Sequence, residues 1–273
     1  MSFTTLQRVV VRMLIDPSFS RAIFASPSDA LAGLELTDEE TDWLLDSDPR
    51  AWRLDPMRRT RMLQSLLEEF PVSATLTLQH DGHAERLDAF FSSPQLHHAV
   101  QTRGLLSRAF GRYLATVEVR GLAPIRTIEA SIVECRRGDD APALPSGSIG
   151  LASAHDILRL PSGSLERYVN YSAMLARESA ERGSPMLETM LSEGFTLGDP
   201  FAPPSATHEY ILVEPSPDGP RLGEVSEALG ALLEAAKPGV ARSTLLNVAC
   251  TLGAEAGEAE ELLHELSAEG LLT

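Results

Sequence analysis

The sequence predicts a mostly helical α+β fold, with a helical N-terminal domain followed by a domain that contains a small sheet. Apolar residues recur at helical spacing through the first half, beginning with Leu6, Val9, Val10, Met13 and Leu14. The clearest run of β-forming residues, 210–213, lies in the second half. With 273 residues, 43% of them hydrophobic, the chain is long enough for two domains with cores of ordinary size.

The helical domain is expected to span residues 1–138. Thr37 and Glu40 have the spacing of a capping box, which predicts a helix start. Apolar residues alternate over 72–78, which alone would indicate a strand, but the helical neighbours favour a helix there. Polar, Pro- and Gly-rich residues 139–147 are typical of a linker.

The second domain is expected to span residues 148–273. Residues 148–152 and 156–160 are predicted to pair as a hairpin, and a helical insert is predicted at 164–195. A third strand at 209–213 and three short helices complete the chain. A three-stranded sheet with three helices is typical of a winged-helix-type module, which binds either a nucleic acid or a peptide strand.

The charge distribution of the sequence indicates which of these two ligands is favoured. The net charge is −16, and residues 139–273 hold 7 Lys and Arg against 21 Asp and Glu. The expected third helix is rich in glutamate, and the helix before it offers only Arg242 and Asn247 for reading bases. Carboxylates repel a phosphate backbone, so the pattern favours a peptide ligand and no nucleic acid.

Motifs of catalysis and of membrane insertion are missing from the sequence. It contains no phosphate-binding loop, no His-Glu-x-x-His and no Gly-x-Ser-x-Gly. His80 and His83 flank Asp-Gly and are more typical of an exposed turn than of a metal site. We expect a cytoplasmic protein, because two distant cysteines fit a reducing compartment and neither a signal peptide nor a membrane span is evident.

Several segments resemble the partner proteins of multinuclear non-heme iron-dependent oxidative enzymes, as in methanobactin and thiaglutamate-type peptide pathways. The segments are Asp88-Ala-Phe-Phe-Ser-Ser-Pro-Gln-Leu-His97, Val100-Gln-Thr-Arg-Gly104 and Ala109-Phe-Gly-Arg-Tyr-Leu114. Residues 126–137 and the final 65 residues are also similar to that family, the latter to its peptide-recognition element. The likeness spans most of the chain.

The resemblance implies a non-catalytic partner subunit with a PqqD-like recognition element for ribosomally synthesised and modified peptides (RiPPs). Such a subunit forms a heterodimer with the iron enzyme through its helical domain, binds a precursor leader by strand addition and presents the core. The iron belongs to the enzyme, so no cofactor or metal ligand is expected in this chain. By position, the implied peptide-binding residues are Glu209, Tyr210, Leu212, Glu214, Leu262 and Glu265. The insert at 164–195 departs from the compact element.

Two other functions remain open from the sequence. A winged-helix transcriptional regulator would bind DNA with a steep salt dependence. A stand-alone metal-dependent enzyme would use His80 and His83.

Overall fold

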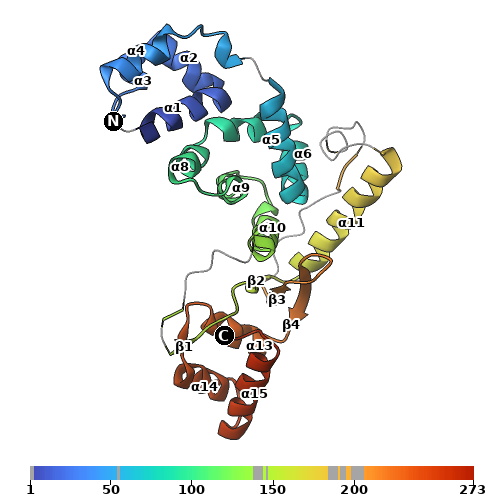
Figure 1. The fold of residues 1–273 in the computed structure, drawn as a ribbon. Helices are drawn as coiled ribbons and strands as arrows, with labels where there is room; N and C mark the ends of the chain where they lie inside the picture. The colour runs from blue at the N-terminus through green and yellow to red at the C-terminus, as the bar shows by residue number, and fades with distance from the viewer. Residues whose placement is uncertain are drawn as a thin grey trace. The chain divides into compact units, whose positions relative to one another are not determined.

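The computed structural model describes residues 3–53, 56–137, 144–145, 147–183, 190, 195–197 and 206–273 (Figure 1). The described residues form two compact units. Unit 1 comprises Met1–Val119 with Arg177–Thr196, and unit 2 comprises Arg120–Ala176 with Leu197–Thr273. The prediction of a mostly helical α+β protein is confirmed.

Unit 1 is built from helices. In chain order they are α1 (Phe3–Ile15), α2 (Pro17–Ala25), α3 (Pro27–Ala30), α4 (Asp38–Asp46), η1 (Ala51–Arg53), α5 (Pro56–Glu69), α6 (Pro71–Asp81), α7 (Glu85–Asp88), η2 (Ala89–Ser92), α8 (Pro94–Thr102) and α9 (Leu106–Leu114). The predicted capping box opens α4, where the Thr37 hydroxyl accepts from the Glu40 N–H and the Glu40 carboxylate accepts from the Thr37 N–H. Local sequence thus decides where this helix begins.

Residues 72–78 are helical, as favoured. They lie in α6, and every side chain from Val72 to Leu78 is buried. A helix that is surrounded by other elements needs no polar face, so Thr and Ser alternate with Val and Leu without indicating a strand. The hydroxyls of Thr75 and Thr77 donate to the carbonyls of Pro71 and Ser73, which satisfies them within the helix.

Unit 2 is organised around a three-stranded antiparallel sheet of order β2-β3-β4. The strands are β2 (Asp156–Pro161), β3 (His208–Glu214) and β4 (Arg221–Val225). A second, two-stranded sheet pairs β1 (Ser148–Ile149) with β5 (Val240–Ala241). The helices are α10 (Leu122–Arg137), α11 (Ser164–Arg182), α13 (Glu227–Ala236), α14 (Arg242–Thr251) and α15 (Ala256–Ala268).

Both faces of the three-stranded sheet are covered. Tyr210 and Leu212 of β3 face the core formed with α13, α14 and α15. Ile211 and Val213 face the opposite way, towards α10 and the first turns of α11. Side chains alternate across a strand, so a strand between two helical layers has apolar residues at every position. This burial explains the continuous apolar run at 210–213.

Three details of the expected topology were wrong. Residues 148–152 do not form a hairpin with 156–160, because β1 pairs with β5. The strand that completes the sheet is β4, which was not expected as a strand. The helix α10, expected in the N-terminal domain, packs on the sheet of unit 2.

The insert is in part as predicted, because α11 begins at Ser164. The predicted second helix of the insert, at 185–193, lies outside the described residues except for Met190. Most of the linker predicted at 139–147 also lies outside them.

Candidate functional site

The strand β4 is a margin of the sheet. Within the described part of the chain it pairs only with β3, with Tyr210 opposite Val225 at one end and Glu214 opposite Arg221 at the other. The other side of β4 therefore has no strand partner among those residues. An unpaired strand edge is a template to which a further extended chain can hydrogen-bond.

The middle of β4 is open on its helix-facing side. Gly223 lies opposite Leu212, and directly opposed residues of antiparallel strands point to the same face. That face is the one covered by α13, α14 and α15. A Cβ built on Gly223 would meet no atom of the described residues within 4 Å, so that part of the structure leaves the space beside it open.

An apolar pocket begins where β4 ends. It has a volume of about 250 Å³, and we call it the β4 pocket; its lining is Ser226, Ala228, Leu229, Leu232, Ala249, Leu252, Ala254 and Leu262. Leu252 in this lining is 40% exposed, so the pocket is open to solvent on that side. A strand edge with an adjoining apolar pocket can bind a backbone and one side chain together.

Acidic residues surround this part of unit 2. Glu224 and Glu227 are exposed at the end of β4 and the start of α13, and α15 exposes Glu258, Glu261 and Glu265. The two basic residues of the segment 226–273 are both in ion pairs: Lys237 with Asp156 at 2.6 Å, and Arg242 with Glu260 at 2.7 Å. Arg221 of β4 is itself exposed, so the negative charge lies beyond it, at Glu224, Glu227 and the exposed side of α15.

The opposite margin, β2, is less accessible to an added strand. At its start the Asp156 carboxylate accepts from the Ser131 hydroxyl of α10 at 2.7 Å and pairs with Lys237 after α13. The side chains of both helical layers thus meet at this end of β2. At its other end Pro161 has no N–H to donate.

The structure corrects the location of the edge. The strand at 209–213 was expected to receive the peptide, but β3 is the central strand and has neighbours on both sides. Tyr210 is 8% exposed, and its ring packs against Gly230 of α13, where an added Cβ would lie 2.1 Å from the Tyr210 Cγ. Leu212 is buried in the same core. Both residues therefore hold the sheet against its helices.

The two acidic residues of β3 differ in their contacts. The Glu209 carboxylate accepts from the backbone N–H groups of Gly163 and Leu165 at 2.9 and 2.8 Å, so it caps the N-terminus of α11. Glu214 is half-buried at the end of β3, opposite Arg221.

One of the two predicted residues of α15 lies close to the end of β4. Leu262 lines the β4 pocket, and Glu265 is exposed one turn further along. Sequence reasoning missed β4 itself, although its signal was present. Asp218-Gly219 is a turn signal between two stretches with β-forming residues, which predicts a hairpin.

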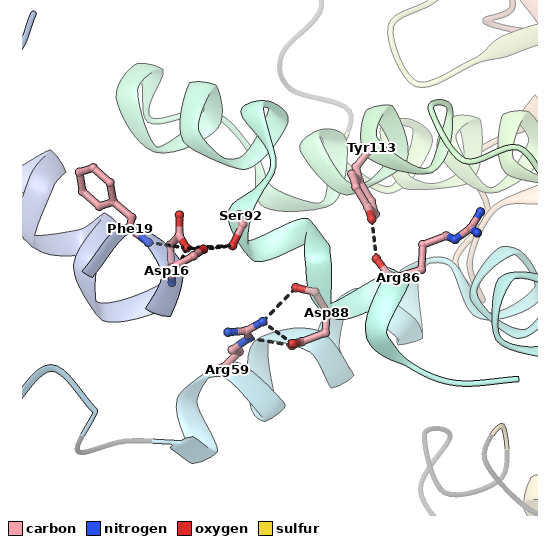
Figure 2. Close-up of polar contacts among 8 residues, drawn as sticks. Asp16, Phe19, Arg59, Arg86, Asp88, Ser92 and Tyr113 are labelled. Carbon is pink, nitrogen blue, oxygen red and sulfur yellow. Dashed lines mark hydrogen bonds and ion pairs between the residues drawn. The ribbon is translucent and has the colours of Figure 1, made fainter. Parts of the chain in front are cut away.

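The family-like segment 88–97 has a structural role in unit 1 (Figure 2). The buried Asp16 carboxylate accepts from the hydroxyl of Ser92 at 2.8 Å and from the backbone N–H of Phe19 at 3.1 Å, and His97 Nε2 lies 3.1 Å away. Arg59 of α5 forms an ion pair with Asp88. These contacts join α2, α5, α7, η2 and α8, so the segment fixes the packing of the helices.

Burial alone would raise the pKa of Asp16, but hydrogen bonds from His97, Ser18, Phe19 and Ser92 outweigh it and hold the pKa well below its usual range. The residue types are those of a hydrolytic triad, but their order is different. In a triad the histidine stands between the serine and the carboxylate, whereas here the carboxylate stands between Ser92 and His97. The Asp16 cluster (Asp16, Ser18, Phe19, Ser92 and His97) is therefore a helix cap whose buried carboxylate accepts from one buried backbone N–H and from side chains that lie nearer the surface.

The described residues contain no group of three or more His, Cys, Asp or Glu side chains placed to hold a metal ion. His80 and His83 are both exposed, at the end of α6 and just after it. No described helix has the length and apolar character to cross a membrane.

Comparison with known proteins found no family model that matches this chain and no curated protein that matches it.

Proposed function

We propose that this chain is a non-catalytic partner subunit of a multinuclear iron-dependent oxidative enzyme in RiPP biosynthesis. Unit 2 binds the leader of the precursor peptide as an added strand, and the complex presents the core of the peptide to the enzyme. The iron is held by the enzyme, and no cofactor is assigned to this chain. The proposal rests on the sequence resemblance and on the open edge of β4.

The β4 edge is the observation that carries the proposal. It combines a strand whose outer side has no partner among the described residues, open space at Gly223 and the β4 pocket at the end of the strand. The three-stranded sheet β2-β3-β4 with the helices α13, α14 and α15 suits a PqqD-like, winged-helix-type recognition element, into which α11 is inserted between β2 and β3. In such an element the leader would lie along β4 and against α15, which moves the binding strand from residues 209–214 to residues 221–225.

The charge of unit 2 limits which leaders are expected to bind, and it argues against DNA as the ligand. The exposed glutamates of α15 favour a leader with basic residues, with an apolar side chain for the β4 pocket. A winged-helix regulator would need cations on α14, and Arg242 is paired with Glu260. The regulator is therefore the weaker alternative. The stand-alone metal enzyme has no described cluster of ligands to support it.

The first test is co-expression with candidate multinuclear iron oxidative enzymes and the short precursor-like peptides encoded near them. We expect one enzyme to co-purify with this chain and one leader to bind it. Backbone hydrogen exchange of the leader complex should slow at residues 221–225. Protection confined to β2, or none in unit 2, would contradict strand addition at β4.

The second test fills the open space at the edge. Gly223→Leu should weaken leader binding at least tenfold, because the new side chain fills the open helix-facing space beside β4 into which side chains of the added strand would pack. Gly257→Leu is the matched control: Gly257 also has nothing within 4 Å of an added Cβ, but it lies in the first turn of α15. Equal loss of binding in both variants would show that the edge is not the site.

A further inference from the structure

Unit 1 carries an exposed apolar groove that the β4 edge does not involve. It runs between α1 and α4 and has a volume of about 750 Å³; we call it the α1–α4 groove, and its lining is Leu6, Gln7, Val10, Val11, Thr37, Glu39, Glu40 and Trp43. Trp43 is 57% exposed and Val11 is 42% exposed. Exposed large apolar side chains that gather along one groove mark a surface that another molecule covers.

The local sequence explains why Trp43 faces outward. Leu44 of α4 is fully buried in the core formed by α1, α2 and their neighbours, and Val9 and Met13 of α1 point into the same core. The next residue on a helix is turned by about 100°, so Trp43 and Val10 lie beside the buried stripe rather than in it. The groove is therefore the outer border of two packed helices, about two helical turns long.

The charge around the groove is of one sign. Glu39 and Glu40 line it, Asp38 and Asp42 are exposed on the same helix, and none of the described lining residues is basic. Basic residues lie on the other flank of α1, where Arg8 and Arg103 line a separate pocket with Val11. An occupant of the α1–α4 groove therefore meets apolar side chains at its centre and carboxylates at its α4 border.

We infer that the α1–α4 groove binds an amphipathic helix of a partner protein, with apolar residues on one face and Lys or Arg beside them. Two parallel walls with apolar side chains suit a helix that inserts residues at i, i+3, i+4 and i+7. A second copy of this chain is a poor occupant, because it brings a net charge of −16 to an acidic border. The identification of this partner as the iron enzyme rests on the proposed function.

The chain offers a direct probe of this groove. It has two tryptophans, and Trp52→Phe leaves Trp43 as the single one. The probes are two synthetic helical peptides with the same leucines, one with Lys and one with Glu on its flanks. We expect the Lys peptide to shift the emission of Trp43 to shorter wavelength, and the Glu peptide to bind at least tenfold more weakly.

Variants then locate the binding. In the Trp52→Phe background, Val11→Asp should weaken binding of the Lys peptide at least tenfold. Glu39→Lys should weaken it several-fold. Val169→Asp is the control, because Val169 is 50% exposed on α11 in unit 2. Circular dichroism checks that each variant is folded. A shift that Val11→Asp and Val169→Asp reduce equally, or no shift with the Lys peptide, would overturn the inference.

Further measurements separate this inference from the leader site and from self-association. Val11→Asp should leave leader binding at β4 unchanged, and Gly223→Leu should leave the response of Trp43 to the Lys peptide unchanged. Emission that shifts with protein concentration alone, together with a dimer that Val11→Asp dissociates, would assign the groove to a second copy and overturn the partner helix.

Discussion

The strands β3 and β4 are neighbours in one sheet, yet they differ in almost every property that bears on binding. β3 has a strand on each side, and its residues 210–213 are buried. β4 has one neighbour among the described residues, and it exposes Arg221, Gly223 and Glu224. The hydrophobic run therefore marks the centre of the sheet, whereas the more polar strand beside it keeps an edge for a ligand. A strand that is buried between two neighbours cannot also offer its backbone to an added strand.

The largest change in stability is expected in the Asp16 cluster of unit 1. It sets the scale for the changes expected in the two strands. Asp16→Ala should lower the free energy of unfolding by about 2–4 kcal/mol, because α2 loses its cap and Ser92 and His97 lose a charged acceptor. Chemical denaturation measures this change. Ser47→Ala, which removes the hydroxyl that accepts from Trp52, is a milder control within unit 1 and should cost about 1 kcal/mol. Equal losses would contradict the central role of Asp16.

The same residue gives a pH dependence of known sign. The Asp16 pKa is lower in the folded than in the unfolded protein, so its stabilisation is present above the unfolded value of about 4 and is lost as pH falls through the folded value. The difference in unfolding free energy between the natural protein and Asp16→Asn should therefore be constant from pH 7 to 5 and shrink in stronger acid. A difference independent of pH down to 2 would refute the assigned shift.

Much of unit 1 and little of the binding site could be predicted from the sequence. Helix starts such as Thr37 and Ser93 depend on contacts three residues away, so local reading succeeds there. Which strand is central depends on pairing across dozens of residues, and β2 and β3 are separated by α11. Tyr210 was assigned to binding because its run is the most β-like, and burial on both faces produces that same pattern.

Two glycines test the contrast between the strands directly. Gly230→Ala should destabilise unit 2 by about 1–3 kcal/mol, because the new Cβ on α13 would overlap the ring of Tyr210 from β3. Gly223→Ala should change stability by less than about 0.5 kcal/mol, because its Cβ meets open space beside β4. Thermal or denaturant unfolding compares the two. If Gly223→Ala were the more costly change, the edge of β4 would not be open.

A variant of Glu209 tests whether this carboxylate stabilises the fold or binds the leader. Glu209→Ala should lower stability by about 1–2 kcal/mol through loss of the cap on α11, because the N–H groups of Gly163 and Leu165 lose their acceptor. Leader affinity should stay within about twofold of the natural protein, since the residue lies on the central strand. Isothermal titration gives the affinity; a loss above tenfold in folded protein would return the binding site to β3.

The smallest effect concerns charge at the β4 edge. The glutamates of α15 are exposed, so each contact with a basic leader residue contributes only about 0.2–1 kcal/mol and is screened by salt. Raising NaCl from about 0.05 to 0.5 M should therefore weaken leader binding about fivefold. This is equivalent to about 1 kcal/mol from two such pairs. Glu261→Gln with Glu265→Gln should flatten this dependence, whereas Glu39→Gln in unit 1 should leave it as it is. Affinity that ignores salt would mean that the leader is held by its backbone and its apolar side chain, with the acidic surface serving another purpose.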